Sequence, residues 1–209
     1  MIVLVFDTET TGLPKDYNGS LYDSDNWPYI VQLSYIVFDC KQNTILHKIN
    51  QFIKLPKGIK IPESATAIHH VTNEMCETDG IDITVALKDF NTYAKLATRL
   101  VAHNISFDKR LIVVESIRNN KLSIFTKNPA IYCTMKSTTH KCKIERKFKD
   151  GTSYYKYPTL TELHEHLFQT TPKGTHDAIN DVLICLRCYY FLEYNKDLVT
   201  SHSVFEAVL

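Results

Sequence analysis

Apolar residues follow two different spacings along this chain. The chain begins with an unbroken apolar run, Ile2 to Phe6, and so short a run predicts a strand buried on both faces of an α/β sheet. Further on, between Phe107 and Ile117, apolar residues recur at helical spacing. Strands are predicted near 2–7, 30–39, 44–54, 99–104 and 130–134, and helices near 82–97, 107–118, 159–168 and 177–194. The pattern as a whole indicates an α/β fold.

Two acidic residues come at the end of the first predicted strand. Asp7 and Glu9 lie in the sequence FDTETTG, and residues two apart on a strand project to the same side. Two neighbouring carboxylates repel each other unless a cation lies between them. The spacing therefore suits a metal site, although the D-x-E pattern alone is more often a strand end with solvated acids.

A third acid, Asp108, lies in the sequence HNISFD, between a predicted strand and a predicted helix. This places it near a helix start at the carboxyl end of a strand, the edge where open α/β sheets bind ligands. An acid in the first helical turn is also favoured by the helix dipole alone. Taken by itself, Asp108 fits both interpretations equally well.

The fourth acid, Asp181, follows a histidine, His176, in the sequence HDAIND. On one helix, five residues turn the chain through about 500°, so these two side chains would point roughly 140° apart and could not serve one site. Asp177 is a good N-cap, which predicts that the helix begins after it and that Asp181 lies one turn in. His176 then lies on the preceding loop and can reach the site, whereas an isolated loop histidine would simply be exposed.

The acidic residues occur in three sequence patterns, D-x-E-T-T-G, H-N-x-x-F-D and H-D-A-x-x-D, in this order. Carboxylate oxygens suit hard cations such as Mg²⁺ or Mn²⁺, and a cluster that holds two such ions is common in enzymes that cut phosphodiesters. The three patterns together resemble the DEDDh, or DnaQ-like, family of 3′→5′ exonucleases. The resemblance covers roughly residues 1–194 and includes the segments 30–33, 67–74 and 160–164.

The resemblance implies a ribonuclease-H-like fold, in which helices flank a mixed five-stranded sheet. It implies that four catalytic carboxylates hold two Mg²⁺ or Mn²⁺ ions and that His176 is the general base; the carboxylates are Asp7, Glu9, Asp108 and Asp181. It also implies that further residues bind the 3′-terminal nucleotide: Thr10, Gly12, Leu13, Ile68, His69, Asn104 and Phe107. The chain departs from the family pattern after His69, where His70 replaces the usual glycine.

Length and composition favour one domain over residues 1–209, and the resemblance implies that it is an exonuclease domain. The chain is 44% hydrophobic and has a net charge of +1. Its apolar start is too short for a signal or membrane segment, so we expect an intracellular protein, in the cytoplasm or nucleus, with no membrane partner. The six cysteines are typical of reduced thiols. Cys133, His140 and Cys142 lack a fourth ligand at the usual spacing, so no zinc site is predicted.

Three segments lie outside the predicted elements. Residues 14–29 contain prolines, a glycine and several acids, which predict a surface loop, and Trp27 within it is expected to pack on the core. Residues 135–157 form a basic insert. The tail, residues 195–209, ends in an apolar sequence that could dock a partner.

Positive charge is concentrated in the basic insert and in the residues just before it. Between residues 121 and 156 there are nine Lys or Arg and only two acids. Aromatic residues alternate with this charge, namely Phe148, Tyr154, Tyr155 and Tyr157. Single-strand channels use this combination for phosphates and for base stacking, although a solvated charged hairpin explains it equally well.

These features predict a metal-dependent 3′→5′ exonuclease that releases 5′-mononucleotides from single-stranded or frayed 3′ ends, with DNA favoured over RNA. One alternative is a proofreading or binding subunit that acts mainly in complex with a DNA polymerase, although such subunits usually extend further beyond the nuclease part than residues 195–209. The other is an enzyme that trims RNA 3′ ends. Oligoribonucleases normally carry Gly-Asn where this chain has His103-Asn104, which disfavours that group.

Overall fold

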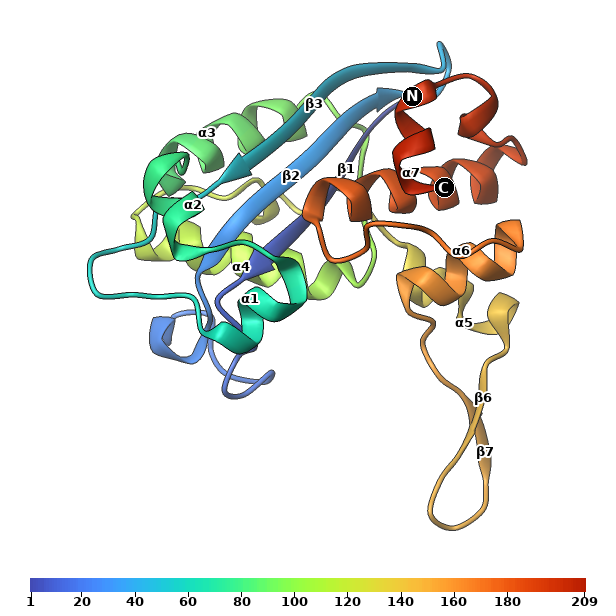
Figure 1. The fold of residues 1–209 in the computed structure, drawn as a ribbon, viewed down its shortest axis with the longest axis horizontal. Coiled ribbons are helices and arrows are strands. Elements are labelled where there is room, and N and C mark those ends of the chain that lie inside the picture. Colours follow the sequence, from blue (N-terminus) through green and yellow to red (C-terminus); the bar gives the residue numbers. More distant parts are fainter.

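The computed structural model describes residues 1–209 and contains a five-stranded sheet with helices on both faces (Figure 1). The strands are β1 (Ile2–Thr10), β2 (Ile30–Asp39), β3 (Thr44–Phe52), β4 (Arg99–Ala102) and β5 (Ile131–Cys133). Their order in the sheet is β3-β2-β1-β4-β5. The pairs β1–β2 and β2–β3 are antiparallel, whereas β1–β4 and β4–β5 are parallel. This architecture confirms the predicted mixed five-stranded sheet.

Seven α-helices accompany the sheet: α1 (Glu63–His69), α2 (Asn73–Thr78), α3 (Ile83–Ala94), α4 (Ile105–Arg118), α5 (Thr134–Cys142), α6 (Leu160–Phe168) and α7 (Ala178–Tyr194). The sequence pattern predicted α3, α4, α6 and α7, but it missed α1, α2 and α5. The first two are too short for their apolar spacing to be visible, and α5 is mostly polar. Strand β4 ends before residue 104 because Asn104 adopts a left-handed conformation, φ 64°, at the start of α4.

Both faces of β1 are buried, as predicted. Leu4 and Phe6 pack with residues of α3 and α4 on one face. Val3 and Val5 alternate with them and pack with residues of α7 on the other face. Since strand side chains alternate, Asp7 and Glu9 continue the side that faces α7.

The 14–29 loop is fixed to the body of the protein. Trp27 is buried, which confirms the predicted packing, and its indole N–H donates to the carbonyl oxygen of Ser20 at 3.0 Å. Arg118 at the end of α4 donates to the carbonyl oxygen of Pro28 at 2.9 Å. Its guanidinium also lies 3.9 Å from the centre of the Tyr29 ring. The loop is therefore held close to the carboxyl end of β1, which it follows.

The C-terminal tail folds back onto α7 as two short 3-10 helices, Leu198–Thr200 and Ser203–Val208 (Figure 1). Phe205 and Val208 are fully buried in the core on that side of the sheet. The core already covers these two side chains, and docking of a partner by the rest of the tail stays a prediction.

The basic insert, residues 135–157, contains most of α5 and a two-stranded hairpin that projects from the body (Figure 1). The hairpin strands are β6 (Glu145–Lys147) and β7 (Ser153–Tyr155), and they form a small antiparallel sheet of their own. We call residues 135–157 the basic arm.

None of the helices of the protein combines the length and the apolar character needed to span a membrane.

Candidate active site

The end of β1 leaves one of its edges open. Strand β4 pairs with β1 only from Val3 to Val5, so the residues that follow have no strand partner on that side. On the other side, Asp7 lies opposite Ser34 and Glu9 lies opposite Gln32 on β2. Directly opposed residues of an antiparallel pair share a face, so the two acids lie over a polar part of the sheet.

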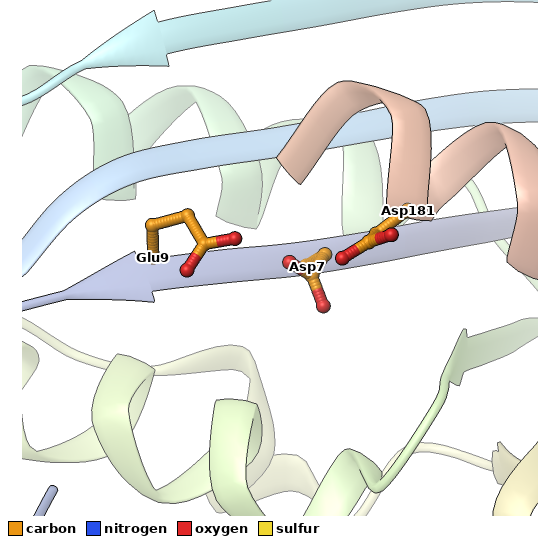
Figure 2. Close-up of side chains that lie close together, drawn as sticks. All are labelled: Asp7, Glu9 and Asp181. Atoms are coloured by element: carbon orange, nitrogen blue, oxygen red, sulfur yellow. The ribbon is translucent and has the colours of Figure 1, made fainter. Parts of the chain in front are cut away.

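Asp181 reaches the same place from α7. Its helix begins as predicted, because the side chain of Asp177 accepts a hydrogen bond from the backbone N–H of Ile179 at 3.1 Å. Asp181 then lies one turn inside the helix. The carboxylates of Asp7, Glu9 and Asp181 each offer an oxygen atom, and these atoms lie within 4.8 Å of one another (Figure 2).

Gln32 connects the sheet to the first turn of α7. Its side-chain oxygen accepts the backbone N–H of Ala178 at 3.5 Å, and its amide nitrogen donates to Asn50 at 2.8 Å. Gln32 is buried, and this bridge joins the first turn of α7, which carries Asp181, to the strand. The segment 30–33 is part of the family resemblance, but this role of Gln32 depends on the strand register and could not be predicted from the sequence.

Asp108 approaches from the open edge of β1. The carboxylate is buried, and its Oδ1 accepts two hydrogen bonds from Thr8, one from the backbone N–H at 3.1 Å and one from the hydroxyl at 2.8 Å. The Thr8 N–H would otherwise have no strand partner on this side. Thr8 therefore fixes Asp108 beside the other three acids, and this residue was not predicted.

His176 lies on the loop before α7, as predicted. Its φ of 67° is left-handed, its backbone N–H donates to Oδ2 of Asp181 at 3.2 Å, and its side chain is exposed. The backbone is thus fixed to one member of the acidic cluster, while the imidazole is accessible to solvent and to a substrate.

Burial and mutual repulsion dominate the electrostatics of the four acids. Burial, followed by the neighbouring carboxylates Asp108, Asp181 and Glu9, raises the pKa of Asp7 well above its usual value. Burial, followed by the carboxylates of Asp181, Asp108 and Asp177, raises the pKa of Glu9 to about 8. Burial is also the largest cause that raises the pKa of Asp108 to about 7 and the pKa of Asp181 to about 7. At neutral pH, the four groups cannot all carry charge without a cation.

The donor set fits a hard divalent cation. Oδ1 of Asp181 is buried and has no hydrogen-bond partner within the protein. An unpaired buried carboxylate oxygen is costly, and a metal ion is a natural partner for it. Oxygen ligands are those that Mg²⁺ and Mn²⁺ prefer. Asp7, Glu9 and Asp181 could therefore hold one ion directly, and Asp108 lies close enough to add its charge to the site.

A cavity of about 460 Å³ opens next to Glu9. Its lining contains six of the seven residues predicted to bind the terminal nucleotide: Thr10, Gly12, Leu13, Ile68, His69 and Phe107. Leu13 and Ile68 are 70% and 56% exposed and present apolar surface to the cavity. Asn104 does not line this cavity. It begins α4, and its side-chain oxygen accepts a hydrogen bond from the Ser106 hydroxyl at 3.1 Å.

His69 braces the end of β1. It is buried, its Nε2 lies 3.1 Å from the carbonyl oxygen of Thr10, and its Nδ1 accepts the backbone N–H of Val71 at 3.1 Å. These two contacts assign the neutral tautomer with the proton on Nε2, and burial lowers the pKa of His69. Its ring nitrogens are both engaged, so the residue shapes the cavity through Thr10.

The sequence and the fold of this chain are similar to those of known exonucleases. A family model described as Exonuclease matches residues 4–189. Among curated proteins, none matches the sequence of this chain. Many solved structures match this fold, among them three exonuclease structures, and this likeness confirms the predicted ribonuclease-H-like fold class.

The first of these structures is E. coli exonuclease I in complex with a dT13 oligonucleotide. It has a TM-score of 0.66 and 14% identity over 92% of this chain and 41% of that one. A zinc-bound complex of E. coli ExoI with ssDNA has a TM-score of 0.65 and 15% identity, over 95% of this chain and 42% of that one. Exonuclease X in complex with 5′ overhanging duplex DNA has a TM-score of 0.56 and 20% identity, over 97% of this chain and 99% of that one.

Proposed function

The chain belongs to the DEDDh, or DnaQ-like, family of exonucleases, whose model spans residues 4–189, and on that premise we propose that it is a two-metal 3′→5′ exonuclease. It would release 5′-mononucleotides from single-stranded or frayed 3′ ends, with DNA preferred over RNA. The observation that carries this proposal is the meeting of the Asp7 and Glu9 carboxylates on β1 with that of Asp181 on α7, whose buried Oδ1 has no hydrogen-bond partner within the protein.

The acidic residues of this chain divide the work by position. Asp7, Glu9 and Asp181 would hold the ions directly, and Asp108 would complete the set from the opposite edge of β1. When bound, Mg²⁺ or Mn²⁺ ions supply a lowered pKa for an attacking water and stabilise the charge on the leaving 3′-oxygen. Two hydrogen bonds from Thr8 hold the Asp108 carboxylate in place, and they also favour its ionised form.

His176 would remove the proton from the attacking water. Its imidazole is exposed, and its backbone N–H is hydrogen-bonded to Asp181. The ring can therefore approach the substrate while the backbone of His176 stays at the acidic cluster. A general base must come within hydrogen-bond reach of the proton that it removes, and the geometry often tightens only when substrate binds.

The cavity beside Glu9 would hold the 3′-terminal nucleotide. Leu13 and Ile68 offer apolar surface to a nucleobase, and Gly12, at φ 147°, lets the backbone approach closely. Phe107 closes the side next to α4. We place Asn104 near this nucleotide only through its position at the start of α4.

The preference for DNA is supported by the relatives. Exonuclease I is seen with dT13, and exonuclease X with 5′ overhanging duplex DNA. The experiment is a time course with single-stranded DNA, duplex DNA with a 3′ overhang, and RNA, each labelled in turn at the 5′ and the 3′ end, with Mg²⁺, with Mn²⁺ or with EDTA.

The proposal predicts that a 3′ label is released at once as a mononucleotide, whereas a 5′-labelled strand shortens stepwise, only with metal. Faster degradation of RNA than of DNA would reverse the substrate preference. Release of internal fragments, or activity in EDTA, would contradict the exonuclease mechanism.

A further inference from the structure

The basic arm, residues 135–157, leaves the body at the edge of the sheet that carries the acidic cluster. Strands β1, β4 and β5 are parallel, so their carboxyl ends meet at one edge. Asp7 and Glu9 lie at the end of β1, Asp108 follows β4, and the arm follows β5. A strand of nucleic acid that reaches the active site along this edge would therefore pass the arm.

His103 clamps the two ends of the arm. Its Nδ1 lies 2.9 Å from the hydroxyl of Thr134, just before the arm, and its Nε2 lies 3.0 Å from the carbonyl oxygen of Pro158, just after it. Burial lowers the pKa of His103 to about 4, so the ring is neutral and Nε2–H donates to Pro158. Lys156 adds an ion pair with Glu162 on α6 at 2.6 Å. The base of the arm is therefore fixed relative to the motif that contains Asp108.

The charge on the arm is exposed and not neutralised within the protein. Six of its cations are exposed and form no ion pair: Lys136, Lys141, Lys143, Arg146, Lys147 and Lys149. One of its two acids, Asp150, accepts hydrogen bonds from the backbone and hydroxyl of Thr152, where it shapes the hairpin turn. A concentrated unpaired positive surface attracts a polyanion.

The aromatic side chains of the arm are exposed and do not pack into the hydrophobic core. Phe148 and Tyr157 are 55% and 56% exposed, and the rings of Phe148 and Tyr154 stack with their centres 4.3 Å apart. Tyr154, Tyr155 and Tyr157 also line a hollow of about 700 Å³ between the hairpin and α5, and Lys136 and His140 close its other side. None of these aromatic residues belongs to the hydrophobic core.

We propose that the basic arm is a second binding site for single-stranded nucleic acid, which holds the strand on the 5′ side of the nucleotide being removed. The inference rests on the proposed function, because it assumes that the 3′ end lies at the acidic cluster. Lysine and arginine side chains contact phosphates, and a base stacks on the tyrosines of the hollow. A duplex would offer phosphates but hide its base faces, so the exposed aromatic rings favour a single strand.

The test is equilibrium binding in EDTA, where no cleavage occurs, with a long oligothymidylate and a duplex of equal length as probes. One variant replaces Arg146, Lys147 and Lys149 with Gln, and its matched control replaces Lys88, Lys95 and Lys121, three exposed lysines on the α3 and α4 side of the sheet. A second pair of variants replaces Tyr155 and Tyr157 with Ala or with Phe.

The glutamine variant of the arm should flatten the dependence of log K on log salt for the single strand by up to about 2, at roughly 0.7 per lost phosphate contact. The Tyr→Ala variant should weaken single-strand binding by about 5-fold or more, and the Tyr→Phe variant should recover it because stacking needs only the ring. The control should match the wild type.

Salt dependence and affinity equal to those of the control would overturn the inference, and a larger loss for the duplex than for the single strand would assign the arm to duplex binding instead. The binding assay does not depend on cleavage. Wild-type protein that binds through the arm but releases no mononucleotide would therefore refute the proposed function alone, whereas an active nuclease with unaffected arm variants would refute the arm alone.

Discussion

Replacing Thr8 with Val tests how the protein positions Asp108. The substitution keeps the shape and the strand preference of a buried side chain, and it removes only the hydroxyl that donates to Oδ1 at 2.8 Å. A hydrogen bond to a charged group contributes about 1.5–3 kcal/mol, which corresponds to roughly 10- to 150-fold in an equilibrium constant. Residues that orient metal ligands typically change metal affinity or activity by about 10- to 100-fold when mutated. Both values predict an effect of similar size for Thr8→Val.

The assay is the rate of mononucleotide release as a function of Mg²⁺ concentration and pH. Thr8→Val should need about 10- to 100-fold more Mg²⁺ for half-maximal rate. Because the Thr8 hydrogen bonds lower the pKa of Asp108, the acid limb of the pH profile should also move to higher pH. Thr8→Ser, which keeps the hydroxyl, should restore both. If Thr8→Val and Thr8→Ser show the same Mg²⁺ dependence and the same acid limb, the reasoning is refuted.

Three further predictions concern the acidic cluster and its loop. Without metal, the free energy of unfolding, measured by urea titration, should fall as the pH rises from about 4 to about 8. The reason is that the pKa values of Glu9 (about 8) and Asp181 (about 7) exceed their ordinary values, so ionising these acids destabilises the fold. Added Mg²⁺ should restore the free energy of unfolding. Asp181→Asn should stabilise the metal-free protein at pH 8 by about 2–4 kcal/mol; a loss of stability would contradict this. His176→Ala should slow cleavage by about 10² to 10⁴-fold yet keep Mn²⁺ affinity. Asp177→Ala should instead lower stability by about 1 kcal/mol in thermal unfolding, because it removes the N-cap of α7. Equal catalytic losses in the two variants would show that their roles are misassigned.

The parts of the fold that local pattern controls were predictable. The apolar run before Asp7 predicted a strand buried on both faces, and the N-cap at Asp177 predicted the start of α7 and the loop position of His176. Both depend on neighbours within a few residues. The shared face of Asp7 and Glu9 followed from strand periodicity alone.

The contacts that join distant segments were not predictable from the sequence. Thr8 and Asp108 are 100 residues apart, and Gln32 and Ala178 are 146 apart, so their hydrogen bonds depend on sheet register and helix height. His69 was predicted to bind substrate from its place in a motif. The structure shows that its ring nitrogens are already bonded to the backbone, which only the packing of α1 against β1 could reveal.

The central claim is that the carboxylates of Asp7, Glu9, Asp108 and Asp181 form a divalent-metal centre that cuts from 3′ ends. The most direct measurement is the initial rate of mononucleotide release from 3′-labelled single-stranded DNA in Mg²⁺, for each single Asp→Asn or Glu→Gln variant. Asp25→Asn, in the exposed part of the 14–29 loop, is the control. All four variants should lose activity while remaining folded, and the control should retain it. Full activity in Asp7→Asn and Asp181→Asn would contradict the assignment of the metal centre.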